Sequence, residues 1–245
     1  MSYLVIMTTE TAAKLTKRPS NLRGTTHSGW GKNRHTFAFG NYVEENHVGF
    51  RDLRIINEAH LDPGKGLGTQ SHRSMELFSY VVEGELQHKN SLGEDYSLRT
   101  GDFQHLSAGS GVQLNELNPQ SDGKTHFLKM WIVPRSQGGE PRYARINIAE
   151  KRVHNGLSLL ASPDGEDGSA RIRQDSQIFF GDLTAGQTLT LSENCLYPYA
   201  WIQMIEGKVH LDTVTLEAGD GAAIHTSAFT IEGDADSEFL LFRLK

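Results

Sequence analysis

The chain has 245 residues, a hydrophobic content of 37% and a formal net charge of −6 at pH 7. Its length allows one large β-domain or two domains of about 120 residues each. The negative charge, which no run of basic residues offsets, excludes a surface built to bind nucleic acid directly.

The N-terminal segment carries no sign of a targeting signal. Its apolar run, Tyr3–Met7, is too short for the core of a signal peptide, and no stretch of the sequence approaches the length of a membrane helix. Glu10–Lys17 has the pattern of a brief helix, the one helix that we predict. The single cysteine, Cys195, excludes an intrachain disulfide and fits a reducing compartment. We therefore expect a cytoplasmic protein that does not contact a membrane.

Turn signals then recur along most of the remaining chain. Between them lie short runs in which apolar residues alternate, as in Leu128/Met130/Ile132. Short strands at this spacing are typical of a β-sandwich or a β-barrel. The clearest turn signals are Asp62-Pro63-Gly64, Glu83-Gly84, Gly101-Asp102, Gly109-Ser110-Gly111, Glu206-Gly207 and Gly219-Asp220-Gly221.

An internal repeat is the most informative feature of the sequence. Three segments return in the same order, 122, 123 and 118 residues further on: Leu61–Leu67 as Leu183–Leu189, Val81–Leu86 as Met204–Val209, and Leu98–Asp102 as Leu216–Asp220. A repeat of this kind indicates a duplicated structural unit. We therefore predict an all-β protein of two tandem jelly-roll β-barrels, formed by residues 1–135 and 136–245.

The sequence also resembles a known family. The segments that carry the resemblance are Gly29–Tyr42, Gly68–Glu76, Ser107–Gly111, Asn115–Pro119 and Ser162–Gly165. With them the chain resembles the pirin family, and in particular bacterial pirin-like proteins related to quercetin 2,3-dioxygenases, over nearly its whole length. The resemblance implies a bicupin fold whose N-terminal barrel normally holds a metal.

In that family, the N-terminal barrel presents a His-x-His pair and a His-x-Glu pair to a divalent, iron-type metal. The resemblance places Gln70 and His72 at the first pair and Leu114 and Glu116 at the second. Leucine has no lone pair and an amide oxygen is a weak ligand, so half of the set is lost. We expect no bound cofactor, or at most a divalent transition metal such as iron held by the residual ligands His72 and Glu116.

The polar side chains at these positions are open to two interpretations. His72 and Glu116 could hydrogen-bond each other inside the barrel, with Gln70 closing the network, because a buried charge needs a partner. Alternatively, the cluster is a pocket in which a small molecule is recognised. Glu76 has the same parity as residues 70 and 72, so it either lines the same interior or caps a turn.

The second barrel offers candidate metal ligands of its own. The repeat carries the four ligand positions onto three carboxylates and a thiol, which could form a second metal site, although a lone cysteine is more often a small buried hydrophobe. These residues are Glu193, Cys195, Glu232 and Asp234. The other histidines are scattered without metal-ligand spacing. We expect the tryptophans to pack in the cores; they are Trp30, Trp131 and Trp201.

Three functions remain open from the sequence. The first is a non-catalytic or repurposed protein that binds a small phenolic molecule, another small molecule or a protein. The second is a metal-dependent, quercetin 2,3-dioxygenase-like oxygenase that uses His72 and Glu116. The third is a regulatory module that acts on a protein partner. We expect a monomer or a small homo-oligomer.

Overall fold

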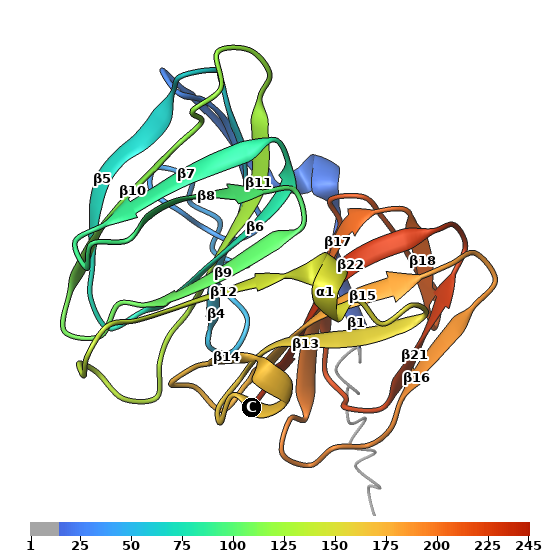
Figure 1. Ribbon diagram of the computed structural model, residues 1–245. Coiled ribbons are helices and arrows are strands. Elements are labelled where there is room, and N and C mark those ends of the chain that lie inside the picture. Colours follow the sequence, from blue (N-terminus) through green and yellow to red (C-terminus); the bar gives the residue numbers. More distant parts are fainter. Residues whose placement is uncertain (1–14) are drawn as a thin grey trace, which may run out of the picture.

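Two β-barrels lie side by side in this computed structural model, which describes residues 15–245 (Figure 1). In the first barrel, a seven-stranded sheet of order β12-β9-β6-β11-β4-β3-β2 accompanies a four-stranded sheet of order β5-β10-β7-β8. Its strands are β2 (Gly24–Ser28), β3 (Gly31–His35), β4 (Leu53–Leu61), β5 (Gly66–His72), β6 (Glu76–Glu83), β7 (Glu85–Asn90), β8 (Asp95–Arg99), β9 (Asp102–Ser107), β10 (Val112–Leu117), β11 (Thr125–Ile132) and β12 (Arg142–Asn147).

The second barrel repeats this arrangement. Its sheets have the orders β1-β20-β17-β22-β15-β13-β14 and β16-β21-β18-β19. Its strands are β1 (Leu15–Arg18), β13 (Gly156–Ser162), β14 (Ala170–Arg171), β15 (Gln177–Leu183), β16 (Thr188–Leu191), β17 (Tyr199–Glu206), β18 (Lys208–Leu211), β19 (Val214–Glu217), β20 (Gly221–Ile224), β21 (Phe229–Gly233) and β22 (Ser237–Leu244). The prediction of an all-β bicupin is confirmed.

The two barrels exchange strands. The first strand, β1, pairs with β20 of the second barrel, and β12, which follows the expected boundary at residues 135/136, pairs with β9 of the first barrel. The helix predicted at Glu10–Lys17 is wrong where it can be compared, because Leu15–Lys17 lies in β1; its remainder falls outside the described residues. A local pattern could not reveal a partner strand that lies some two hundred residues away. A short α-helix, α1 (Ile148–Lys151), and two 3-10 turns, at Ser20–Leu22 and Glu166–Gly168, complete the described elements.

The repeated Glu-Gly turns have the same structural cause. Gly84 and Gly207 both have positive φ angles, 86° and 78°. A Cβ atom on Gly84 would lie 2.7 Å from the carbonyl oxygen of Lys124, and one on Gly207 would contact the carbonyl oxygen of Asp236. Glycine is therefore required at both turns for conformation and for space.

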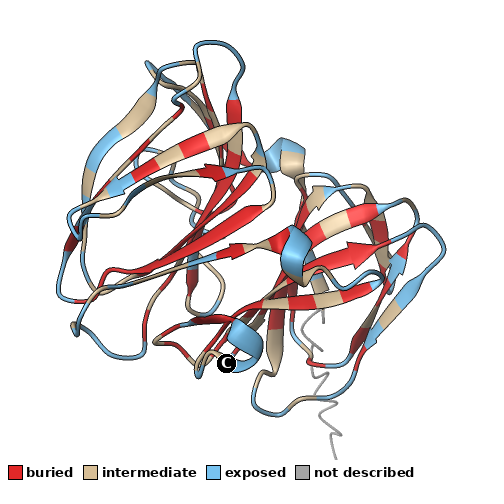
Figure 2. Ribbon diagram, in the orientation of Figure 1, coloured by how far each residue is buried: buried red, intermediate tan, exposed pale blue. Residues whose placement is uncertain are grey.

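The largest apolar core lies between the barrels rather than inside either one. It joins the outer faces of the two seven-stranded sheets and contains Phe78, Leu128, Phe180, Trp201 and Phe242. Figure 2 shows the buried residues concentrated on the strands that meet at this junction. The second barrel has a separate interior cluster that is apolar throughout. No helix in residues 15–245 is both long enough and apolar enough to cross a membrane.

Candidate functional site

The strand register brings three of the four predicted ligand positions together inside the first barrel. β5 and β10 are antiparallel neighbours in which Leu114 is paired with Gln70 and Val112 with His72. Glu116 lies two residues further along β10 and is 1% exposed. Leu114 is also buried and packs in an apolar cluster with Leu77 and Leu106.

A lysine that the sequence analysis did not identify lies at the centre of this group. The Lys129 ammonium, from β11, donates to Glu116 Oε2 at 2.7 Å and to Gln70 Oε1 at 3.0 Å. The other carboxylate oxygen, Glu116 Oε1, accepts from Ser79 Oγ at 3.0 Å and from Gln104 Nε2 at 3.2 Å. Glu116 is thus held by one ammonium and two neutral donors.

The ion pair determines the charge state of the site. Burial alone would raise the pKa of Glu116, but the Lys129 ammonium and its hydrogen bond outweigh that effect and hold the pKa below its usual value. The carboxylate is therefore ionised at neutral pH, and the ammonium provides the positive charge that compensates it. Such a buried pair is stable only when both partners are present.

His72 does not take part in this network, so the expected hydrogen bond between His72 and Glu116 is wrong. Its Nε2 atom is buried without a hydrogen-bond partner among residues 15–245, and its ring packs edge-on against Trp131, with ring centroids 5.0 Å apart. Burial, followed by the Lys129 charge, lowers the pKa of His72 to about 4. His72 is therefore a neutral ring at physiological pH.

Glu76 faces the opposite side of the sheet from this site. It is buried, and it accepts hydrogen bonds from Ser107 Oγ at 2.7 Å and pairs with His105 Nε2 at 2.6 Å. It belongs to β6, whereas residues 70 and 72 belong to β5, and the turn between them contains Ser74 with a φ of 48°. The alternation of side chains between the two faces of a strand does not continue through such a turn. The interpretation of Glu76 as an interior residue is wrong for this reason.

The structure adds another histidine to the interior. His88, on β7, is fully buried, is the direct strand partner of Glu116 and stacks on Tyr96, with ring centroids 5.0 Å apart. Burial lowers its pKa, so it too is neutral. His88 and Lys129 come from strands outside the two family motifs. A lysine within the apolar run Phe127–Trp131 was the one available signal, because a charged residue in a buried strand needs a partner.

A cavity of about 200 Å³ opens beside the ion pair. Its lining residues include three aromatic ones, and its polar lining residues include Lys129 and Gln70. Two further lining groups, Asn33 Oδ1 and Trp131 Nε1, are buried without a hydrogen-bond partner among the described residues. The complete lining is Trp30, Asn33, Phe39, Asn57, Ala59, Leu67, Gln70, Lys129 and Trp131.

The donors in the first barrel do not fit a three-histidine, one-carboxylate metal site. Both oxygens of Glu116 are engaged by protein donors, Leu114 provides an apolar surface, and His72 is directed at Trp131. Within the part of the chain that the structure describes, one group of three potential ligands has its atoms within 4.8 Å of one another: Glu58, His60 and His126. That group lies outside the barrel interior.

The hypothesis of a metal site in the second barrel is wrong. All four residues that the repeat placed there are exposed: Glu193, Cys195, Glu232 and Asp234. Glu193 and Cys195 lie in the loop after β16, Glu232 lies in β21, and Asp234 follows it directly. β16 and β21 turn apolar side chains inward, with Leu189 paired to Ile231 and Leu191 paired to Phe229. The connection between β16 and β17, residues 192–198, is longer than that between β5 and β6, residues 73–75, so the offset that relates β6 to β17 does not hold for the strand before each of them.

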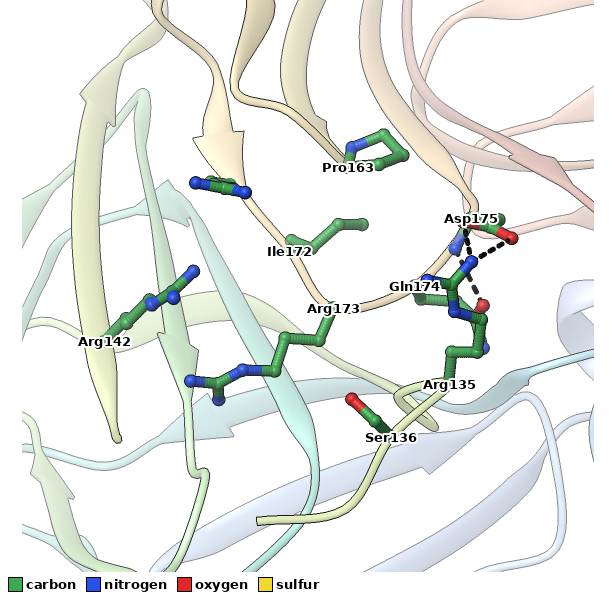
Figure 3. A pocket seen from close by; sticks show the side chains of 9 residues that line it. Arg135, Ser136, Arg142, Pro163, Ile172, Arg173, Gln174 and Asp175 are labelled. Carbon is green, nitrogen blue, oxygen red and sulfur yellow. Dashed lines mark hydrogen bonds and ion pairs between the residues drawn. The ribbon is translucent and has the colours of Figure 1, made fainter. Parts of the chain in front are cut away.

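A second cavity, of about 250 Å³, lies between the barrels and is lined by arginines (Figure 3). Arg135 pairs with Asp175 at 3.1 Å, and Arg173 donates to Ser107 Oγ at 2.7 Å and to the carbonyl oxygen of Glu140 at 2.5 Å. Arg135 and Arg173 are therefore engaged by protein groups. The lining of this cavity is rich in arginine, whereas the lining of the cavity beside Lys129 is rich in aromatic residues.

Comparisons with known proteins agree with this architecture. Residues 16–132 match the Pirin family, and residues 159–244 match the Quercetinase C-terminal cupin domain. The chain is 36% identical to the quercetin 2,3-dioxygenase of Escherichia coli K12 over 93% of its own length and 97% of that protein, and 32% identical to a pirin-like protein of Caulobacter vibrioides over 92% and 97%. The bacterial pirin YhhW from Escherichia coli, solved in complex with nickel(II), is 36% identical and superposes with a TM-score of 0.89 over 94% of this chain and 98% of that one.

Proposed function

The chain belongs to the pirin family of bicupins, a family that includes quercetin dioxygenases, and from this premise we propose that its first barrel binds a small aromatic acid or phenol without a metal. One observation carries the proposal: the Lys129 ammonium lies within hydrogen-bond distance of both Glu116 and Gln70, two of the four positions at which the family arranges its ligands.

Electrostatics support the absence of a metal from this barrel. Two unit charges of the same sign, about 4 Å apart near a protein surface, repel each other by about 4 kcal/mol, and a dication doubles that figure. A metal at Glu116 would have to displace Lys129 or sit beside it. Displacement would leave the ammonium in the barrel without its carboxylate, which is strongly unfavourable.

The cavity beside Lys129 supports the choice of ligand. Its volume of about 200 Å³ is below the roughly 300–1,000 Å³ of pockets for drug-sized ligands, so it suits one aromatic ring better than a flavonol. An ammonium has three N–H donors, and the protein uses two of those of Lys129. The third can meet a carboxylate or phenolate oxygen, while Asn33 Oδ1 can accept from a hydroxyl group.

Isothermal titration calorimetry with 4-hydroxybenzoate tests the proposal. Trp131→Phe removes the indole N–H from the cavity wall, and we expect it to weaken binding several-fold. Trp201→Phe is the matched control, because Trp201 also has a buried indole N–H without a partner among residues 15–245 but lies in the core between the barrels. Failure of 4-hydroxybenzoate to bind, or equal weakening by both variants, would contradict the proposal.

The alternative is an iron-dependent, quercetin 2,3-dioxygenase-like oxygenase, which the names of the relatives favour. It requires His72 and Glu116 to hold the metal with a changed arrangement of Lys129. Oxygen uptake with quercetin and added Fe(II) distinguishes the two functions. We expect no uptake above that of the buffer; turnover that disappears in His72→Ala would establish the oxygenase.

The cellular setting is part of the same proposal. We propose a cytoplasmic protein, because its lone cysteine, Cys195, is exposed and free, as in proteins of reducing compartments. We also expect a monomer or a small homo-oligomer. Purification of the chain from the soluble fraction with a reduced Cys195 thiol would agree with this location. A disulfide-linked dimer formed through Cys195 in cells would contradict it.

A further inference from the structure

Three potential metal ligands converge on the outer face of the first barrel. Glu58 and His60 are two residues apart on β4 and therefore share a face, and His126 of β11 is the direct strand partner of His60. His60 and His126 show no metal-ligand spacing in the sequence, because 66 residues separate them. Antiparallel pairing of β4 with β11 brings them together, and their rings stack with centroids 4.1 Å apart.

The distances between the ligand atoms are close to those of a metal site. Glu58 Oε1 lies 3.1 Å from His126 Nε2 and 3.7 Å from His60 Nε2, and all three atoms lie within 4.8 Å of one another. A metal that binds nitrogen and oxygen at about 2.0–2.2 Å keeps neighbouring ligand atoms roughly 3–3.5 Å apart. Both Nε2 atoms thus lie near the same carboxylate oxygen, Glu58 Oε1.

The carboxylate is held in position from behind. Arg23 donates to Glu58 Oε2 at 2.6 Å and to the carbonyl oxygen of Gly219 at 3.1 Å, and its guanidinium side chain is fully buried. Oε1 is thereby left to face the histidines. Hydrogen bonds of this kind orient the ligating carboxylates of metal sites. The positive charge of Arg23 also limits the affinity, so we expect a site of moderate strength.

The group is accessible to an ion in solution. The side chains of His60, His126 and Glu58 are 31%, 19% and 14% exposed, respectively. Three charged strand neighbours flank it: Lys32 opposite His60, Arg34 opposite Glu58 and Glu83 opposite His126. Two of them are cationic, so with Arg23 they limit the affinity of the site for a cation. Three protein ligands on one side leave the outer coordination positions to water or to a small ligand.

We propose that Glu58, His60 and His126 form a binding site for a divalent transition metal of the zinc, nickel or copper type. Two imidazoles and one carboxylate are the ligands that such ions accept readily, with positions left open. The site is separate from the barrel interior, because Glu58 and His60 point to the face of the sheet opposite to that of Lys129. It also lies where Arg23 connects the first barrel to the turn before β20 of the second.

Calorimetric titration with Zn²⁺ tests this site. The chain is purified without a metal-affinity tag and treated with a chelator before the titration. We expect one zinc ion per chain, and at least about a tenfold loss of affinity in His60→Ala and in His126→Ala, because even the loss of an outer-shell partner costs about 10–100-fold. His154→Ala is the matched control: His154 also faces a carboxylate, Asp182, at 3.2 Å, but belongs to no group of three potential ligands among residues 15–245.

The outcomes distinguish this site from the barrel interior. Loss of zinc binding in His60→Ala and His126→Ala, with His154→Ala and His72→Ala unaffected, would support the proposal. No zinc binding, or binding that is unchanged in His60→Ala, would overturn it and leave the aromatic-ligand proposal intact. Zinc binding that is lost in His72→Ala would overturn both proposals, because the ion would then occupy the barrel.

Discussion

The two barrels share one strand order and differ in what that order encloses. Positions can be matched through the pairing of the central strands, in which β6 lies between β9 and β11 and β17 lies between β20 and β22. In the first barrel, three neighbouring positions hold Ser79, Gln104 and Lys129. In the second, the corresponding positions hold Ile202, Ala222 and Leu241. A single architecture thus carries a charged interior in one copy and an apolar interior in the other.

The polar interior of the first barrel is therefore not needed for the fold. The second barrel closes around a purely apolar cluster. Burying an ion pair costs desolvation energy, and well-packed apolar residues in its place are often equally stable or more so. The first barrel nevertheless encloses a carboxylate, an ammonium and their neutral donors. We interpret this buried polar group as a sign of ligand binding.

The largest effect is expected when the ammonium alone is removed. Lys129→Met keeps an unbranched side chain that is one atom shorter but leaves the Glu116 carboxylate buried without its partner, which should cost about 3–5 kcal/mol of unfolding free energy. The matched change in the second barrel, Leu241→Met, should cost less than about 1.5 kcal/mol. Urea denaturation of both variants measures the contrast. Equal losses would mean that the ion pair plays no special part.

A second substitution tests whether the unpaired Glu116 charge causes the loss of stability in Lys129→Met. Adding Glu116→Gln to Lys129→Met removes the unpaired charge while the shape of the side chain is kept. Residues in one hydrogen-bond network couple by about 0.5–3 kcal/mol, so the double variant should be more stable than Lys129→Met by an amount in that range. A double variant no more stable than Lys129→Met would show that the buried charge is not the cause of the loss.

Restoring the family ligands should convert the first barrel back to a metal site only if the ammonium is also removed. Gln70→His with Leu114→His provides three histidines in addition to Glu116. In this double variant, however, the Lys129 ammonium still pairs with the Glu116 carboxylate. We expect the triple variant, with Lys129→Met added, to bind Ni²⁺ at least about tenfold more tightly than the double variant. His60→Ala in both backgrounds removes the outer site from the titration. Equal nickel affinity of the two variants would contradict the role given to Lys129.

The smallest effect concerns pH. The pKa of His72 is about 4 in the folded protein, below its usual value of about 6.5, so the unfolded chain binds more protons between these values and stability falls as the pH drops from 7 to 5. His72→Gln should reduce this loss only partly, because burial also lowers the pKa of His35, His47 and His88. Urea midpoints at pH 7 and pH 5 measure it, with His154→Gln as the exposed control. A larger loss of stability between pH 7 and pH 5 in His72→Gln than in the unmodified protein would contradict the lowered pKa of His72.

Most of the fold could be predicted from the sequence, because its determinants are local. The Glu-Gly turns at Gly84 and Gly207 need positive φ angles wherever they occur, so their repetition indicates two copies of one unit. The exchange of β1 and β12 could not be predicted in this way. Each is a short strand whose partner lies in a distant part of the chain, and nothing in its own residues identifies that partner.

The candidate site was predicted only in part, for the same reason. Gln70, Leu114 and Glu116 belong to two strands with recognisable motifs, and their convergence follows from the pairing of those strands. The partners of Glu116 come from other strands, at positions that no metal-ligand motif identifies; they are Ser79, Gln104 and Lys129. The group formed by Glu58, His60 and His126 depends in the same way on pairing across 66 residues.

We propose that the Lys129 ammonium takes the place of a metal in the first barrel. Anomalous diffraction from crystals soaked in Ni²⁺ tests it directly, because the map locates each ion relative to the side chains. We predict a peak beside His60 and His126 and none between Gln70, Leu114 and Glu116, with Lys129 still bonded to the carboxylate. A peak coordinated by His72 and Glu116, with Lys129 turned away, would contradict the account.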